Sequence, residues 1–280
     1  SLSLARTPSG TTHLFAACHY CPARDYLNRL PNPYCASRAG PPTKPEGLCS
    51  STSSDNGRSW SSLVTVDIDG SVPNSPTSSE DGGRLSLLWQ VDTGEVPASG
   101  ISAATAVWSL TNNSWQWPTP RRIWTGIDDG GVRTMVALRR GGVFVPLQTR
   151  NPASIYGQHV SALVQSSQGA WTQSTSSISM PNATTSRFCY GSVEPTAVEL
   201  QNGTLWLLIR TQTGRLWQTW SLDGRTLKPP VPSRFVSGDS PAQLLRLSHP
   251  SWAGAGGSQP LLVLWNNCET SIMAECLAYA

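Results

Sequence analysis

The sequence has few charged residues and no long apolar run. Asp, Glu, Lys and Arg make up only 13% of its 280 residues, and the formal net charge is +3. No basic run is interleaved with aromatic side chains, so nucleic acid is not an expected partner. No apolar segment approaches the roughly 20 residues of a membrane-spanning helix, so we expect no membrane span. The N-terminus also lacks the basic-then-apolar order of a signal peptide.

Helical patterns are missing as well, because no segment shows a convincing helical periodicity. Gly, Pro, Ser and Thr are abundant instead, and this composition suits many short strands joined by turns. We therefore predict an all-β fold. Length alone permits either one large domain or two small ones.

Residues 193–226 contain a complete strand–turn–strand–turn unit. The Asn-Gly pair at 202–203 is typical of a tight hairpin turn. The return strand, which ends at Arg210, is apolar on both faces, as in a strand packed between two sheets. In an antiparallel hairpin the first strand begins beside the end of the second. We therefore expect Glu194 and Arg210 to emerge at the same rim.

A polar turn motif recurs along the chain at an even pitch. Its fullest copy is SSDNGRSW at residues 53–60, and SLDGRT at 221–226 is a second copy. Reduced copies centre on Asn113 and Gln168, and the spacings between the four turns are 58, 55 and 55 residues. Short polar side chains in such a turn can bond the turn's own backbone. A period of this size, with several strands per repeat, is typical of a β-propeller.

Repetition therefore favours a single propeller domain over residues 1–280. The expected repeats are approximately 1–60, 61–117, 118–171, 172–227 and 228–280. Within the second repeat, Leu63 to Ile68 alternates like a strand, and Pro73 to Asp81 is expected to be a surface loop.

The motif at 53–60 resembles the Asp-box of sialidase-like β-propellers. Glu194 and Pro195, followed by a hairpin and an arginine, resemble the fourth-blade region of exo-α-sialidases. The resemblance implies a six-bladed propeller, of which about five blades' worth of sequence is present. It also implies that Glu194 activates a tyrosine nucleophile and that Arg210 binds the substrate carboxylate. The family's other two arginines and its nucleophile would then lie upstream of Ser1 and beyond about residue 278.

The implied substrate is a glycan ending in sialic acid or another acidic sugar. Sialic acid carries a carboxylate on its anomeric carbon, which repels an anionic nucleophile and accounts for the use of a tyrosine. Arginine suits the carboxylate because its planar fork pairs with it bidentately and stays charged when partly desolvated.

Strand ends equivalent to that of Arg210 supply further candidates for the sugar site, and Arg133 is a candidate because it leads into a strand much as Glu194 does. The candidate substrate-binding residues are His19, Asp92, Arg133, Arg150 and Asn266. Taken alone, each of the strand-end residues also fits an ordinary solvated loop end, and Arg133 also fits a surface arginine that covers apolar strand edges. In the first repeat the strand ends in Cys18, where the resemblance implies an aspartate as general acid. Asp25 is the candidate substitute, and His19 is a second possible proton donor.

Cysteines and sequons favour a secreted or luminal setting. Seven cysteines are present, and N-x-[ST] sequons occur at Asn112, Asn182 and Asn202. A cluster of four cysteines allows either disulfides or a four-thiolate zinc site, and its spacing favours disulfides. Its members are Cys18, Cys21, Cys35 and Cys49. We expect no metal and no cofactor.

The sequence leaves the function open between two main readings. The first is a sialidase-like glycoside hydrolase. The second is a catalytically inactive, carbohydrate-binding propeller that has lost its general acid. A scaffold with no sugar site is a third reading, because propellers host many functions.

Overall fold

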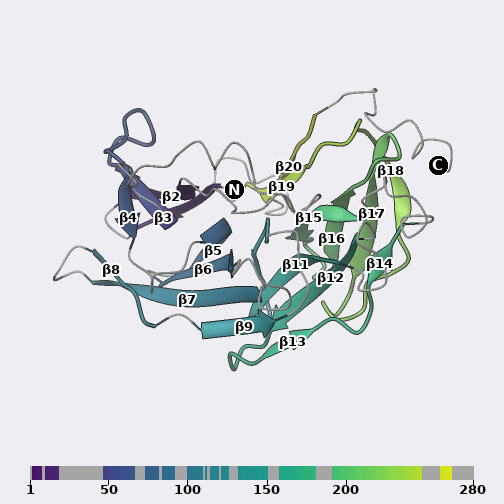
Figure 1. Ribbon diagram of the computed structural model, residues 1–280, viewed down its shortest axis with the longest axis horizontal. Helices are drawn as coiled ribbons and strands as arrows, with labels where there is room; N and C mark the ends of the chain where they lie inside the picture. Colours follow the sequence, from purple (N-terminus) through teal and green to yellow (C-terminus); the bar gives the residue numbers. More distant parts are fainter. Residues whose placement is uncertain are drawn as a thin grey trace, which may run out of the picture. The chain divides into compact units, whose positions relative to one another are not determined.

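A computed structural model describes most of the chain. The described residues are 2–7, 10–18, 47–66, 73–81, 84–91, 100–109, 111, 114–119, 121–125, 132–150, 158–180, 191–247 and 259–266. Within these ranges the regular structure is all strand, twenty strands in total, and no helix occurs (Figure 1). Accordingly, these ranges contain no helix of the length and apolarity needed to cross a membrane. The chain divides into two compact units, Ser1–Val132 and Arg133–Ala280, and each is described by itself.

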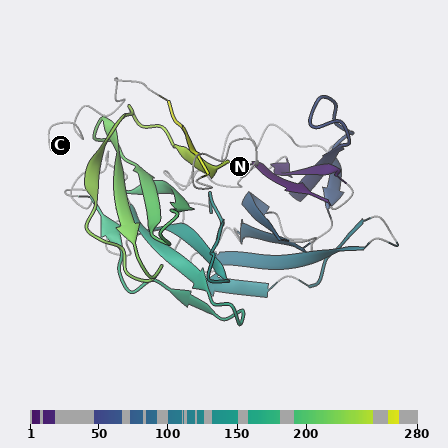
Figure 2. The same cartoon turned by 180° about the vertical axis from the view of Figure 1, so that it is seen from behind.

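The first unit contains two antiparallel sheets whose strands follow in chain order. The first sheet is β1 (Leu2–Arg6), β2 (Thr12–Cys18), β3 (Gly47–Ser53) and β4 (Val64–Val66). The second is β5 (Pro73–Asp81), β6 (Arg84–Val91), β7 (Gly100–Ser109) and β8 (Ser114–Gln116), with β9 (Arg121–Thr125) also paired to β7. Figure 2 shows both sheets from behind, in purple and blue. One buried hydrophobic cluster of this unit comprises Phe15, Leu85, Leu87, Ala104, Ala106 and Trp115.

The segment from Pro73 to Asp81 is a strand, so the sequence-based expectation of a surface loop there is wrong. It pairs with β6, and the register shifts between Asn74 and Thr77. The shift accommodates Ser75 and Pro76 in a bulge, which spares the ladder a proline that cannot donate a hydrogen bond.

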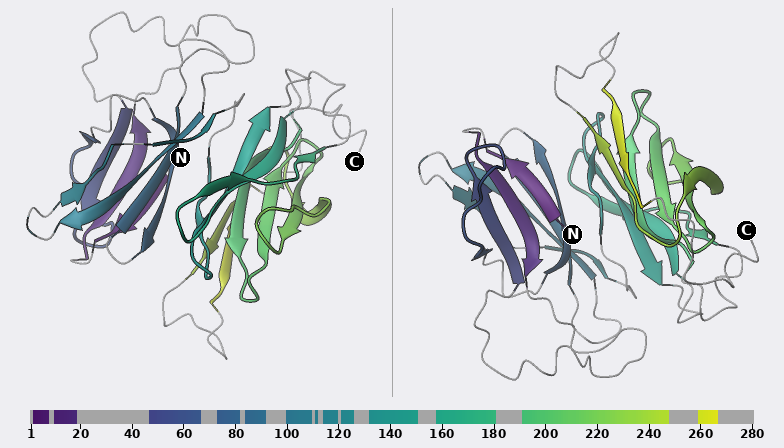
Figure 3. Two further views of the ribbon diagram at one scale, coloured as in Figure 1. Left: turned by 90° about the horizontal axis from the view of Figure 1, so that it is seen from below. Right: turned by 90° about the horizontal axis from the view of Figure 1, so that it is seen from above.

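The second unit contains three antiparallel sheets. The first is β10 (Val136–Ala137), β11 (Val143–Arg150), β12 (Gln158–Gln165) and β13 (Trp171–Gln173), with β14 (Ile178–Ser179) also paired to β12. The second is β15 (Val193–Glu199), β16 (Leu205–Arg210), β17 (Arg215–Ser221) and β18 (Val231–Val236). The third is the pair β19 (Gln243–Arg246) and β20 (Leu261–Leu264). Figure 3 shows this unit, in teal to yellow, from two further directions.

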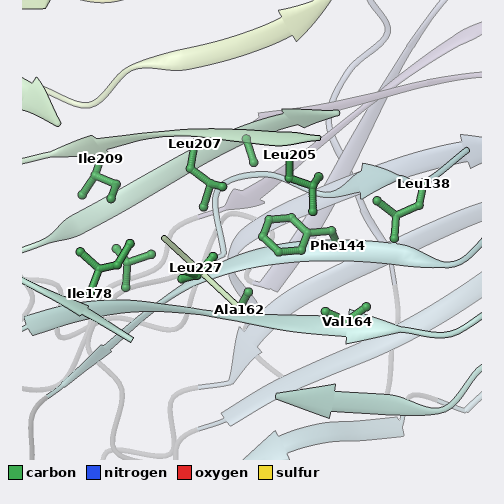
Figure 4. Packing of buried hydrophobic residues seen from close by; sticks show 11 residues of the cluster. Leu138, Phe144, Ala162, Val164, Ile178, Leu205, Leu207, Ile209 and Leu227 are labelled. Carbon is green, nitrogen blue, oxygen red and sulfur yellow. The ribbon is translucent and has the colours of Figure 1, made fainter. Parts of the chain in front are cut away.

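Strand β16 is buried on both faces, which confirms the expectation from its sequence. Leu205, Leu207 and Ile209 pack in one cluster against residues of β11 and β12, including Phe144 and Ala162 (Figure 4). On the other face, Leu208 and Trp206 belong to a cluster shared with β19. Each fully buried leucine contributes about 1.5–3 kcal/mol relative to an exposed one. The alternating apolar side chains thus hold β16 between its neighbouring sheets.

The hairpin between β15 and β16 closes as its sequence predicts. Leu200 N–H donates to the Thr204 carbonyl (2.7 Å), and Gly203 N–H donates to the Leu200 carbonyl (3.0 Å). Gly203 has a φ of 81°, a conformation that glycine adopts without a Cβ penalty. The hairpin register brings Val193 opposite Arg210, so the beginning of β15 lies beside the end of β16.

The polar turn motif forms a local hydrogen-bond network in its two clearest copies, 53–60 and 221–226. In the first, Asp55 Oδ1 accepts the Ser53 hydroxyl (2.7 Å) and the Ser59 backbone N–H (2.9 Å). In the second, Asp223 Oδ1 accepts the backbone N–H of Arg225 and of Thr226, each at 2.8 Å. The two turns occupy matching places, because each joins the third strand of a four-stranded sheet to the fourth.

Each sheet includes the strand that follows its turn. The expected repeats end near the turn instead, at 60 and 227, whereas β4 and β18 continue the same sheets. The sheet boundaries therefore lie one strand further along the chain than the expected repeat boundaries.

Candidate functional site

Glu194 lies at the beginning of β15, inside a bulge. Val193 pairs with Arg210 and Thr196 pairs with Leu208, so Glu194 and Pro195 together oppose a single residue of β16. Glu194 has a φ of 44°, which L-residues with a side chain rarely adopt. A conformation of this kind costs about 1–3 kcal/mol and persists only where its surroundings hold it. The bulge lies at the beginning of β15, and the Glu194 side chain extends from it toward Arg133 and Arg210.

The Glu194 carboxylate lies between two guanidinium groups. Its Oε1 accepts a hydrogen bond from Nη2 of Arg133, and its Oε2 accepts one from Nη1 of Arg210 at 2.5 Å. The side chain of Glu194 is 14% exposed, that of Arg210 is 22% exposed and that of Arg133 is 34% exposed. Partial burial strengthens these charge-assisted contacts relative to fully solvated ion pairs.

A second carboxylate, Asp239, extends the cluster on the other side of Arg210. Its Oδ1 accepts a hydrogen bond from Arg210 Nε at 2.8 Å, and its side chain is only 5% exposed. Its Oδ2 accepts a hydrogen bond from the Gln212 amide at 3.3 Å. Burial by itself would lower the pKa of Arg210. The hydrogen bonds to Asp239 and Glu194 and the attraction of both charges outweigh that effect and raise the pKa.

Asp239 was not among the residues expected from the sequence. It stands between β18 and β19, just as Glu194 stands at the start of β15 and Arg133 stands shortly before β10. Each of these residues thus precedes or opens the first strand of one sheet of the second unit. Asp239 is followed closely by Pro241, much as Glu194 is followed by Pro195. An acidic residue followed within two positions by a proline, just before a strand, is the sequence pattern that could have identified Asp239 as a site residue.

Two buried glutamines support the Glu194 bulge. Gln148 Oε1 accepts the Glu194 backbone N–H at 2.8 Å, and the Gln148 amide donates to Gln158 Oε1. The Gln158 carbonyl also accepts the Ser192 N–H at 3.1 Å. Gln148 is 5% exposed and Gln158 is 9% exposed. These contacts tie the bulge of β15 to strands β11 and β12 of the neighbouring sheet.

The remaining candidate residues are distributed differently. Arg150 ends β11 opposite Gln158 in the strand register, and its side chain lies outside the described part of the structure. Asn266 is exposed, and its amide donates to the hydroxyl of Ser240, next to Asp239, at 3.4 Å. Asp25, His19 and Asp92 lie outside the described residues.

The assembled group is a network of ion pairs. It comprises two arginines and two carboxylates, which balance in formal charge. Among the described residues, Arg210 donates through Nε to Asp239 and through Nη1 to Glu194. The described ranges contain no group of three or more His, Cys, Asp or Glu side chains that could hold a metal ion.

No protein-family model and no curated protein matches this sequence. Solved structures do resemble it. Trypanosoma rangeli sialidase in complex with the inhibitor DANA aligns with a TM-score of 0.62 and 13% identity over 94% of this chain. The K499G mutant of NanB sialidase from Streptococcus pneumoniae aligns with a TM-score of 0.56 and 13% identity, also over 94%. The chain spans 43% of the first protein and 55% of the second. At this identity the likeness shows the fold alone, and the chain has an all-β, sialidase-like fold.

Proposed function

We propose that this protein is a sialidase-like glycoside hydrolase that acts on terminal sialic acid or a related acidic sugar. One observation carries the proposal: Glu194 and Arg210 meet at one end of the β15–β16 hairpin, with Arg133 against the same carboxylate. A sialidase-like fold supports it. The comparisons include T. rangeli sialidase in complex with sialic acid, which aligns over 94% of this chain at 12% identity.

In this proposal the arginines bind the sugar's carboxylate. Arg210 offers Nη2 and the remaining N–H of Nη1, and Arg133 supplies a second cation on the far side of Glu194. As the substrate carboxylate takes over these donors, Glu194 is released to accept a proton from a nucleophile. An arginine fork pairs bidentately with a carboxylate, whereas a lysine would present a single point charge.

Glu194 then acts as the base for a tyrosine nucleophile, as the resemblance implies. The phenol proton passes to Glu194 while the phenolate attacks the anomeric carbon, and a general acid protonates the departing oxygen. Water subsequently hydrolyses the glycosyl intermediate. Asp25 is our candidate for the acid, with His19 as the alternative. Asp92, Arg150 and Asn266 are proposed to contact the sugar.

The test is turnover of a fluorogenic sialoside by the natural full-length protein and by its Glu194→Gln variant. We expect the variant to lose about 10²- to 10⁴-fold in kcat, the usual contribution of a general base. The matched control is Glu199→Gln, because this buried carboxylate ends the same strand, roughly 16 Å away along it. Unchanged turnover in Glu194→Gln would exclude the proposed mechanism.

A second function is a carbohydrate-binding propeller without catalysis. Two observations favour it: β2 ends in Cys18 where the resemblance implies the general acid, and both Glu194 oxygens are engaged by arginines. Binding to sialylated glycans on an array, without release of the fluorogenic group, would select this function over hydrolysis.

We further propose that the sheets are blades of a six-bladed propeller, of which this chain supplies about five. The shared order of the four-stranded sheets, with the polar turn between third and fourth strands, supports this. We also propose a secreted or luminal protein with disulfides. In support, Cys49 is fully buried and bonded in a disulfide.

A further inference from the structure

Asp239 is a buried acid with a strained backbone and hydrogen bonds to both of its carboxylate oxygens. Its side chain is 5% exposed, and its backbone has a φ of 98°, a strained value for a residue with a Cβ. Both carboxylate oxygens are engaged, Oδ1 by Arg210 Nε and Oδ2 by the Gln212 amide. Burial of a charge and backbone strain both cost free energy, and residues that combine them cluster at functional sites.

The loop around Asp239 is tied down on both sides. Ser237 is fully buried; its hydroxyl donates to the Ser240 carbonyl (3.2 Å) and accepts the Ser240 N–H (3.3 Å). The Ser237 N–H donates to the Gly214 carbonyl at 3.0 Å. These bonds close a tight loop across Asp239 and hold its backbone in place.

Glu194 and Asp239 are not equivalent partners of Arg210. A general base must leave its arginine in order to reach a nucleophile, so the Glu194 contact is lost during the reaction proposed above. Asp239 bonds a different nitrogen, Nε, and nothing in the proposed chemistry requires it to move. Its bond to Nε leaves the terminal edge of the guanidinium, Nη1 and Nη2, for the contact with Glu194 and for the carboxylate of the proposed substrate.

We propose that Asp239 is a positioning residue: through Arg210 Nε it fixes the edge of the guanidinium that binds the carboxylate of an acidic sugar. This inference rests on the proposed function of the site. It predicts that Asp239 contributes to the recognition of the carboxylate and not to the recognition of the rest of the sugar.

The experiment measures binding of the α-methyl glycoside of N-acetylneuraminic acid, and of its carboxyl methyl ester, to the full-length protein by calorimetry. Asp239→Asn removes the charge and tolerates positive φ well. We expect it to weaken binding of the acid by about tenfold or more, as for loss of a charge-assisted hydrogen bond. Binding of the ester should stay unchanged.

Two further variants separate positioning from folding. Asp239→Gly relieves the backbone strain and should lose the same affinity for the acid without a fall in Tm. Glu199→Gln, the buried acid at the opposite end of β15, should leave the affinity unchanged. In an Arg210→Lys background, Asp239→Asn should cost no further affinity, because a lysine has no fork to orient.

The outcomes distinguish the two proposals. If the wild-type protein prefers the acid and Asp239→Asn retains that preference, the positioning role is wrong and the proposed function stands. If the wild-type protein shows no preference for the acid over the ester, the proposed function fails, and the role of Asp239 fails with it. An equal loss of affinity for acid and ester would mark Asp239 as merely structural.

Discussion

At the scale of single residues, the two acids of the candidate site share an unusual backbone. Glu194 has a φ of 44° and Asp239 has a φ of 98°. Each such conformation costs about 1–3 kcal/mol, which the surrounding contacts must offset. For Glu194 the contacts are its two ion pairs and the backbone hydrogen bond to Gln148. Among the described residues other than glycine, only Asn56 of the turn at 53–60 shares a positive φ with these two acids.

Gln148 should therefore be important for stability as well as for the site. We expect Gln148→Met, which keeps the volume but removes the acceptor, to lower the free energy of unfolding by about 1–3 kcal/mol. The reason is that the Glu194 N–H loses its buried partner. Urea unfolding measures the change. Gln201→Met in the exposed hairpin turn is the control, expected within about 0.5 kcal/mol of wild type. Equal effects would show that Gln148 does not support the bulge.

At the scale of elements, the turn between β10 and β11 illustrates a glycine required by close packing. Gly142 has a φ of 89°, and a Cβ there would lie 2.1 Å from the Gln165 carbonyl oxygen. Gly203 has a similar φ, yet a Cβ there would meet no atom within 4 Å. An added side chain at Gly203 would therefore cause backbone strain alone, whereas one at Gly142 would cause both backbone strain and a steric clash.

Alanine at these two positions should have different effects. We expect Gly203→Ala to cost about 1–2 kcal/mol from positive φ alone. Gly142→Ala should cost about 2 kcal/mol or more beyond that, because the sheet must shift to admit the methyl group. Paired chemical denaturation curves provide the comparison. Similar losses for the two variants would contradict the clash.

The polar turn at residues 53–60 should respond to pH. Hydrogen bonds from Ser59, first from its side chain, lower the pKa of Asp55 from 3.8 to about 2. A carboxyl whose pKa is lower in the folded state stabilises the fold above its unfolded pKa, and that contribution disappears as pH falls through the folded value. The difference in Tm between wild type and Asp55→Asn should therefore shrink between about pH 4 and pH 2.

Ser59→Ala tests whether the hydrogen bond from the Ser59 hydroxyl lowers the pKa of Asp55. Without the hydroxyl, the pKa of Asp55 should rise toward its ordinary value, as followed by an NMR titration of the carboxyl carbon. A Tm difference between wild type and Asp55→Asn that is constant across this pH range would show that the turn does not bind the charged form preferentially.

At the scale of the whole molecule, a disulfide at Cys49 is expected to stabilise the chain. Cys49 lies in β3 opposite Ala16 and is fully buried. Closing a loop with a disulfide typically adds about 2–4 kcal/mol. We expect reductant to lower the Tm of the wild-type protein, and to lower it less in Cys49→Ser.

Alkylation of the denatured, unreduced protein provides the control for Cys49. Mass spectrometry should find Cys49 unmodified until reductant is added. Because the chain has seven cysteines, at least one other cysteine should be modified unless it pairs with a different chain. A modified Cys49 in the unreduced sample would refute the disulfide.

Local sequence determined much of this protein. The polar turns, the 202–203 hairpin and the two-sided burial of β16 follow from short-range hydrogen bonds and from period-two patterning. The proximity of Glu194 and Arg210 follows from them, because hairpin register fixes which residues face each other. In contrast, β5 was missed, since its prolines and serines suggest a loop and only pairing with β6 makes it a strand.

Tertiary structure decided the rest of the site. Arg133 is 61 residues from Glu194, and Asp239 is 29 residues from Arg210. No local register relates such residues; they meet because the apolar faces of β16 pack against the sheets on either side. The sequence determined which chemistry is present at each strand end. The packing of sheet against sheet decided which of those ends share an ion pair, because burial of apolar faces acts between elements far apart in the chain.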